Sequence, residues 1–371
     1  MYLWMLLLCS ILLFPVTHYT IVIGNKIHNN SYQNGKKIYI VIFSILLIVI
    51  TGLRADTVGK DTMMYHQLYD ITRSASSFSS AMQVWQNKSI EVGFLFLEFL
   101  LGRIMDFHLA SLIFAAISIV PVMILIYRYS ENYWLSLFIY LAFGMYVFTF
   151  AGVRQSLAMG ICCIAFLFAI DNKFIKYIIA IVLAVSIHMS AVIFFPVYWL
   201  IRIKHNKKSI RWFFIGTVVS FVLQSTLYKV LNLFSRNIYE STGSAGGIKL
   251  YLFILGTLVL SYFVSKYFSS GNSATGDIRL EQNGNPPIFN MVAFCALLWP
   301  ITSANAVVFR LYYYYFLFLM LFIPNFISSI SNKESKMITL GVYLFVGCYF
   351  LQFYTLGNTQ MMYSTYSFFW N

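Results

Sequence analysis

The chain has 371 residues, of which 60% are hydrophobic and 10% carry a charge, and its mean hydropathy is +0.76. Because ordinary soluble domains carry about 25% charged residues, this composition excludes an ordinary soluble enzyme. The net charge of +13 does not indicate a nucleic-acid partner, since an excess of Lys and Arg on the cytoplasmic side of a membrane protein accounts for it.

Long apolar runs recur from end to end and predict an all-α polytopic integral membrane protein, with 1–371 as a single membrane domain. About twelve helices are expected to cross the membrane. The first lacks a basic n-region and a small-residue cleavage site, so we expect a span rather than a removed signal peptide. In chain order the predicted spans are 2–23, 38–53, 109–127, 133–150, 154–171, 174–188, 190–203, 211–231, 249–268, 288–304, 309–328 and 337–355.

Two parts of this pattern are irregular. The segments 174–188 and 190–203 are short, so they could form one helix that is broken around His188. The segment 91–107 is apolar but carries four ionisable groups, which make full exposure to lipid expensive. These groups are Glu91, Glu98, Arg103 and Asp106.

Lysine-rich runs between the apolar segments predict the sidedness of the chain. Four of them, 25–37, 171–176, 202–211 and 331–336, are typical of cytoplasmic loops. All four lie inside only if 91–107 does not cross the membrane. We therefore expect a re-entrant or surface-lying helix there, within an outer loop 54–108. The alternative is that 91–107 crosses and the first two spans are inverted.

Arginine is concentrated on the predicted outer side. The outward arginines are Arg54, Arg73, Arg103, Arg154, Arg236 and Arg310. Sidedness alone gives no reason for them, and arginine is the better bidentate ligand of phosphate. This distribution indicates a phosphorylated, lipid-anchored ligand at the outer leaflet.

The loops differ in composition. The outer loops 55–90 and 232–248 and the inner loop 269–287 are expected to be the least structured parts of the chain. The inner loop 269–287 is polar and rich in Pro and Gly, which predicts a flexible cytoplasmic linker without chemistry.

Arg154 and Gln155 begin a predicted helix directly after Gly152. The ordinary interpretation of such an arginine is snorkelling to the membrane interface. Because helix follows the pair without any loop, we expect both side chains to face protein or a cavity. Small residues nearby, including Gly160, allow close helix approach.

His188 and Arg310 lie in apolar surroundings in the sequence. A satisfied core histidine is the ordinary interpretation of His188, but a neutral-pH proton acceptor in a span is also a functional candidate. Arg310 is followed by four tyrosines, among them Tyr313. An interfacial tyrosine belt explains these, and aromatic faces also suit sugar rings.

Glu91 and Glu98 lie seven residues apart and share one helical face. Paired carboxylates suit glycosidase-type acid/base chemistry. Alternatively, Glu98 merely pairs with Arg103 on the same helix.

The five cysteines lie in apolar spans without a metal-ligand spacing. Neither a disulfide framework nor a metal site is therefore predicted, and no cofactor is expected.

Several short motifs occur together in one order. They are "LRADTVGKDTMMYHQLY", "IEVGF", "AGVRQSLAMGI", "SIHMSAVIF" and "FRLYYYYFLFLMLFIP". This combination resembles the EpsG-type exopolysaccharide and O-antigen polymerase family (Wzy class), from about residue 38 to residue 330. The first motif matches at Arg54, Gly59, Asp61, Thr62 and Tyr65. One departure is Val92, where related sequences commonly have proline after the glutamate.

The resemblance implies a metal-independent glycosyltransferase of GT-C-like architecture in the bacterial inner membrane. Such enzymes join repeat units carried on undecaprenyl pyrophosphate at the periplasmic face, and release undecaprenyl pyrophosphate. The partners it implies are undecaprenyl-pyrophosphate-linked glycans, membrane lipids, a chain-length regulator and a flippase of the same pathway, with no nucleic acid.

Residue roles follow from this mechanism. Arg154 and Arg310, with Arg54 third, are expected to stabilise the departing pyrophosphate. His188 is the candidate general base, with Asp61 as the alternative. The expected substrate-binding residues are Arg54, Lys60, Tyr65, Glu91, Gln155 and Tyr313.

Two other functions remain open. An O-antigen ligase uses the same lipid-linked donor and has similar needs for Arg and His. A non-catalytic flippase or transporter would line a pathway through the middle of the membrane with charged groups and often shows repeat symmetry.

Overall fold

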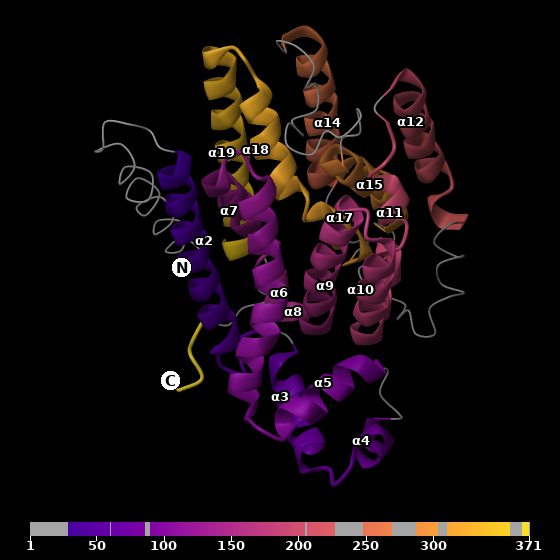
Figure 1. Ribbon diagram of the computed structural model, residues 1–371. Coiled ribbons are helices and arrows are strands. Elements are labelled where there is room, and N and C mark those ends of the chain that lie inside the picture. Colours follow the sequence, from indigo (N-terminus) through magenta and orange to yellow (C-terminus); the bar gives the residue numbers. More distant parts are fainter. Residues whose placement is uncertain are drawn as a thin grey trace. The chain divides into compact units, whose positions relative to one another are not determined.

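The computed structural model is all-helical over the residues that it describes (Figure 1). These are 29–59, 61–85, 90–204, 206–226, 248–268, 287–302, 310–356 and 366–370. The chain divides into two compact units, and each is described by itself. Unit 1 comprises Met1–Arg128, Tyr133–Val192 and Leu344–Asn371, and unit 2 comprises Tyr129–Asn132 and Ile193–Tyr343.

Unit 1 contains the N-terminal half of the described helices. They are α2 (Asn29–Gly52), α3 (Thr62–Ser74), α4 (Phe78–Trp85), α5 (Val92–Gly102), α6 (Phe107–Tyr129), α7 (Tyr133–Ala142), α8 (Phe148–Ala151), α9 (Val153–Ile170) and α10 (Phe174–Ile187). Helix α5 packs against α3, α4 and α10, and α10 packs against α9. Figure 1 shows α3, α4 and α5 together at one end of this unit.

Unit 2 is arranged around α15 (Pro287–Thr302), which contacts α12, α14, α17 and α18. The other elements are η1 (Met189–Phe194, which begins in unit 1), α11 (Val197–Leu200), α12 (Lys207–Val222), α14 (Ile248–Phe268), η2 (Arg310–Tyr312), α17 (Tyr313–Phe316), α18 (Leu319–Ser329) and α19 (Lys333–Leu356, which continues into unit 1). A proline at the first position of α15 suits a helix start, because that position needs no N–H donor.

Five stretches of the described chain are long and apolar enough to cross a membrane. They are Asn34–Gly52, Phe107–Tyr129, Val153–Ile170, Arg310–Ser329 and Lys333–Gln352. Shorter apolar helices lie between them. The chain is therefore a multi-pass membrane protein, as predicted. The expected first span, 2–23, and most of the loops 232–248 and 269–287 lie outside the described residues.

Three expected elements differ from the structure. The predicted span 133–150 is wrong as one helix, because α7 ends at Ala142 and the chain turns at Gly144, whose φ is 75°. Left-handed backbone of this kind favours glycine. The predicted span 38–53 corresponds to α2, which begins earlier, at Asn29, and includes the buried Lys36. The described part of the loop 55–90 is mostly helical, since it contains α3 and α4.

The two segments that are irregular in the sequence form short or interrupted helices in the structure. Helix α5 has 11 residues, which makes it about 16 Å long, so it is too short to cross an apolar layer of about 30 Å. Helix α10 ends at Ile187, His188 follows in extended backbone, and a 3-10 helix begins at Met189. The re-entrant or surface position of α5 stays a prediction.

Close packing of α9 on α6 depends on Gly160. A Cβ atom there would lie 2.1 Å from the carbonyl oxygen of Ile117, so one helix would have to move. We expect Gly160→Ala to lower the unfolding midpoint in detergent. Gly341→Ala is the matched control, because a Cβ meets nothing within 4 Å there, and alanine in a helix is favoured over glycine by about 1 kcal/mol. Equal midpoints for the two variants would contradict this packing argument.

Candidate functional site

A charged cluster in unit 1 is centred on the carboxylate of Glu91. Its Oε2 accepts a hydrogen bond from Nη1 of Arg154 at 2.5 Å, and its Oε1 lies 2.9 Å from Nδ1 of His188. The backbone N–H of Met189 also donates to Oε1, at 2.9 Å. The Nε of Arg154 donates to the hydroxyl of Tyr65 at 3.0 Å. The structure thus brings together four of the residues that the sequence singled out.

Helix ends position this cluster, which we call the Glu91 cluster (Tyr65, Glu91, Arg154 and His188). Glu91 is the residue that precedes α5, and His188 is the residue that follows α10. Arg154 is the second residue of α9. The three charged or titratable side chains are about one-fifth to one-quarter exposed, at 19%, 19% and 25% for Glu91, Arg154 and His188. A ligand can therefore reach groups whose backbones are held in packed helices.

Gly93 allows α5 to approach the end of α10. A Cβ atom at this position would lie 2.3 Å from Oγ of Ser186 and 2.6 Å from its carbonyl oxygen. Only glycine therefore lets Glu91 come within hydrogen-bond distance of His188. Ser186 is the surface on which Gly93 packs.

Glu91 stays ionised because of its donors. Burial by itself would raise the pKa of this carboxyl, but the hydrogen bond from His188, the charge of Arg154 and the N–H of Met189 lower the pKa to about 2. For Tyr65, burial raises the pKa, and the nearby Arg154 offsets this only in part. The phenol therefore keeps its proton while its oxygen accepts from Arg154.

Arg54 lies in a buried position and organises the loop that it begins. Its Nε donates to the carbonyl oxygen of Val58 at 3.1 Å and to Oγ1 of Thr62 at 3.2 Å. The guanidinium also donates to the carbonyl oxygen of Thr51 and lies 5.4 Å from the ring centre of Phe150. Much of its bonding capacity is thus directed at the protein backbone.

The remaining residues of the first motif have structural roles that depend on their spacing. Gly59 has a φ of 95°, and a Cβ there would lie 2.4 Å from the carbonyl oxygen of Phe150. Thr62 begins α3 and donates to the carbonyl oxygen of Val58 at 2.7 Å. Asp61 directly precedes α3, and its charge acts on Tyr65. The loop therefore starts α3 at the register that points Tyr65 toward Arg154.

A small cavity of about 20 Å³ lies within unit 1. Arg54, Tyr65, Ser111 and Thr149 are among its lining residues. Its volume suits about one water molecule. Arg54 and Tyr65 thus face a common space within unit 1.

The other predicted site residues are not part of the Glu91 cluster. Gln155 is buried in α9. Arg310 begins η2 and Tyr313 begins α17, and both belong to unit 2. Lys60 lies outside the described residues.

Glu98 does not pair with Arg103. Arg103 donates to the carbonyl oxygen of Ala75 and lies 4.4 Å from the ring centre of Phe99. Both carboxyl oxygens of Glu98 are buried and have no hydrogen-bond partner in the described part of the chain. Burial raises the pKa of Glu98 to about 8, and Arg154 offsets this only in part. Glu98 is fully buried in α5, so its carboxyl is withdrawn from any substrate that reaches the Glu91 cluster.

The sequence model of the EpsG family matches residues 37–368, which includes every residue of the Glu91 cluster. No curated protein and no solved structure matches the chain.

The low pKa of Glu91 predicts a pH-dependent contribution to stability. A folded pKa of about 2 lies below the unfolded value of about 4.3, so the contribution is complete above pH 5 and is lost as the pH falls toward 2. Between pH 5 and pH 3 we expect wild type to lose about 2 kcal/mol of unfolding free energy through this group. Glu91→Gln lacks this component. Denaturant unfolding in detergent at both pH values measures the difference, and identical pH dependence of the two proteins would contradict it.

Proposed function

The chain belongs to the EpsG family, and from this membership we propose that it polymerises oligosaccharide repeat units carried on undecaprenyl pyrophosphate. The family is a glycosyltransferase-like polymerase family. The observation that carries the proposal is the carboxylate of Glu91, which joins a guanidinium and an imidazole in one cluster. We place the reaction at the periplasmic face of the bacterial inner membrane, within a GT-C-like protein of about twelve spans.

The bonds that change define what the site must supply. The anomeric C–O bond between the growing glycan and its pyrophosphate breaks, and a hydroxyl oxygen of the incoming repeat unit forms the new bond to that carbon. The hydroxyl proton passes to a base, and undecaprenyl pyrophosphate leaves with the bonding electron pair. The protein must therefore accept a proton and stabilise negative charge on phosphate.

His188 is the base in this proposal. An ionised carboxylate can only accept hydrogen bonds, so Nδ1 of His188 must donate to Glu91. The Nε2 nitrogen then carries the lone pair and accepts the proton of the acceptor hydroxyl. Glu91 stabilises the imidazolium that forms, as the carboxylate does in a catalytic triad.

Arg154 stabilises the leaving pyrophosphate. In the reactive state of this proposal, Glu91 and Arg154 carry opposite charges and Nε2 of His188 carries no proton, so these three groups sum to zero. When His188 takes the proton, the sum becomes +1 while negative charge grows on the pyrophosphate. This attraction is stronger in the transition state than in the ground state, which is the condition for catalysis. Tyr65 holds the guanidinium in place.

Arg310 and Tyr313 are proposed to act from unit 2. Arg310 would provide a second guanidinium for the diphosphate, and Tyr313 a ring for a sugar. Arg54, Lys60, Asp61 and Gln155 would line the entry path or support these groups. A flippase and a chain-length regulator of the same pathway are the proposed protein partners.

The principal alternative is an O-antigen ligase, which shares the donor. A knockout separates the two: loss of a polymerase leaves lipopolysaccharide with single repeat units, and loss of a ligase leaves uncapped core with glycan held on the carrier lipid. A flippase is less well supported, because the Glu91 cluster sits at helix ends instead of lining the middle of a helix bundle.

Lysine substitution tests the guanidinium contacts. We expect Arg154→Lys and Arg310→Lys each to reduce polymerisation by about 10²–10³-fold with retained expression, since lysine cannot reproduce a forked contact. Purified protein with lipid-linked repeat units, analysed by product length on gels, gives the measurement. Arg73→Lys is the control, because Arg73 is an exposed residue of the last turn of α3. Wild-type product lengths in a well-expressed variant would remove that arginine from the mechanism.

Alanine substitution tests the base. His188→Ala should lower turnover by about 10²-fold or more while carrier binding changes little. Binding of undecaprenyl pyrophosphate and single-turnover rates are measured on the same preparation. If the variant weakens binding and leaves the single-turnover rate intact, His188 only positions the substrate.

A further inference from the structure

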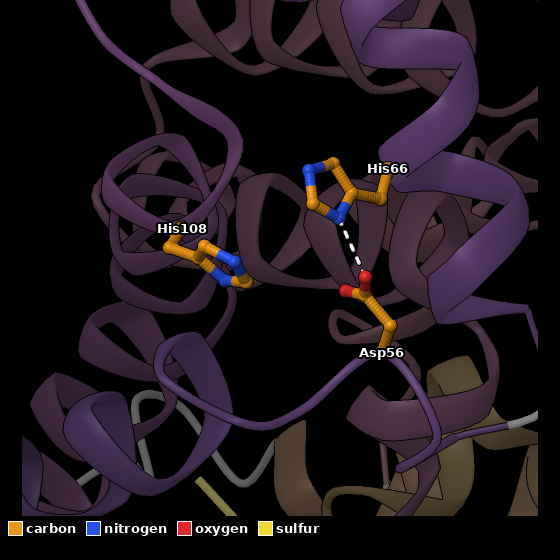
Figure 2. A group of neighbouring side chains, drawn as sticks. All are labelled: Asp56, His66 and His108. Atoms are coloured by element: carbon orange, nitrogen blue, oxygen red, sulfur yellow. Dashed lines mark hydrogen bonds and ion pairs between the residues drawn. The ribbon is translucent and has the colours of Figure 1, made fainter. Parts of the chain in front are cut away.

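A second cluster in unit 1 consists of Asp56, His66 and His108. Each residue offers one ligand atom, and these atoms lie within 4.8 Å of one another. The carboxylate Oδ2 of Asp56 lies 2.7 Å from Nδ1 of His66. Figure 2 shows His108 across a common gap from this pair. The residues come from the loop before α3, from α3 itself and from the start of α6, so folding alone brings them together.

Two atoms of this cluster lack the partners that buried polar groups normally have. Oδ1 of Asp56 and Nδ1 of His108 are buried without a hydrogen-bond partner among the described residues. Leaving such an atom unsatisfied is unfavourable, because it loses its hydrogen bonds to water without replacement. In Figure 2 the second oxygen of Asp56 lies on the side that faces His108. A cation in the gap would satisfy both groups at once.

Neighbouring side chains hold both imidazoles in place. His66 stacks on Phe107 at 4.4 Å between ring centres, and His108 stacks on Phe369 at 4.0 Å. The second nitrogen of His66, Nε2, lies 3.7 Å from the carboxylate of Asp70, one helical turn along α3. A histidine that binds a metal commonly donates its other N–H to such a carboxylate.

We propose that Asp56, His66 and His108 bind a divalent transition-metal ion, with Zn²⁺ as the first choice. Two imidazoles and one carboxylate are a ligand set that Zn²⁺ accepts, with water in the fourth position. Zinc binds these atoms at about 2.0–2.2 Å, so the ligands of one ion lie within about 4.4 Å. Small side-chain rotations close the described separation to this value.

The ion would fix α3 relative to α6 and to the loop that contains Arg54. His66 directly follows Tyr65 in α3, and Tyr65 accepts the hydrogen bond of Arg154. The proposed role is therefore positional: the metal holds the helix that orients Arg154. This role is separate from the chemistry at Glu91, so it is compatible with a metal-independent transfer step.

Cobalt binding to the full-length protein tests the site without any activity measurement. Protein without a polyhistidine tag is purified in detergent, stripped with chelator and titrated with Co²⁺, whose visible absorption reports imidazole and carboxylate ligation. We expect one ion per chain, displaced by Zn²⁺. His66→Ala and His108→Ala should abolish the absorption band, and Asp70→Asn should weaken affinity by about 10- to 100-fold.

The control is His205→Ala, a histidine of the predicted cytoplasmic loop outside the described residues, which should bind Co²⁺ as wild type does. Zn²⁺ should also raise the unfolding midpoint of wild type and not that of His108→Ala. A stripped wild type that binds no stoichiometric Co²⁺ would overturn the proposal, whether or not the variants fold. Unchanged binding in both histidine variants would also overturn it.

Discussion

The candidate site depends on one ionised carboxylate. Glu91 is largely withdrawn from water, and it keeps its charge because an arginine, a histidine and a backbone N–H all point at it. Removing the carboxylate would leave Arg154 close to apolar helices without its main counter-charge. The loss of stability from such an unpaired charge is much larger than the net stability that the intact ion pair provides. Glu91 therefore connects the ends of α5, α9 and α10, and the same carboxylate determines which nitrogen of His188 donates a hydrogen bond.

Sequence reasoning singled out every member of this cluster, Glu91 included, but it could not show that Glu91 joins the other members. Arg154, His188 and Tyr65 belong to motifs whose residue types are unusual in an apolar chain, so composition alone makes them conspicuous. Glu91 pairs with Arg154 and His188 over 63 and 97 residues of chain, and no local periodicity encodes such pairing. The resemblance gave a weak indication that Glu91 precedes a helix. Related sequences commonly have proline at the position of Val92, and proline suits the first residue of a helix.

Hydropathy predicted the fold class for a physical reason, and it failed at particular residues for another. Backbone N–H and C=O groups in lipid must form their hydrogen bonds within helices, so long apolar runs predict membrane helices reliably. Window averages do not register a single turn, and the left-handed Gly144 ends α7 inside a continuous apolar run. Similarly, Arg54 after an apolar segment suggested a ligand contact, whereas much of its hydrogen bonding is to backbone oxygens. Residue type cannot distinguish an arginine that binds a substrate from one that closes a loop.

Unit 1 contains two clusters in which opposite charges meet, and α3 contributes a residue to each. Tyr65 contacts the Glu91 cluster and the adjacent His66 contacts Asp56, so any displacement of α3 changes both. In a half-buried environment the attraction between charges is less screened than in water. A gain of one positive charge at His188 would therefore attract a nearby phosphate strongly. A charge-poor protein can therefore use a few fixed groups where a solvated site would need many. The polar segment beside the apolar helix α2 is best understood as the support that keeps these groups in register.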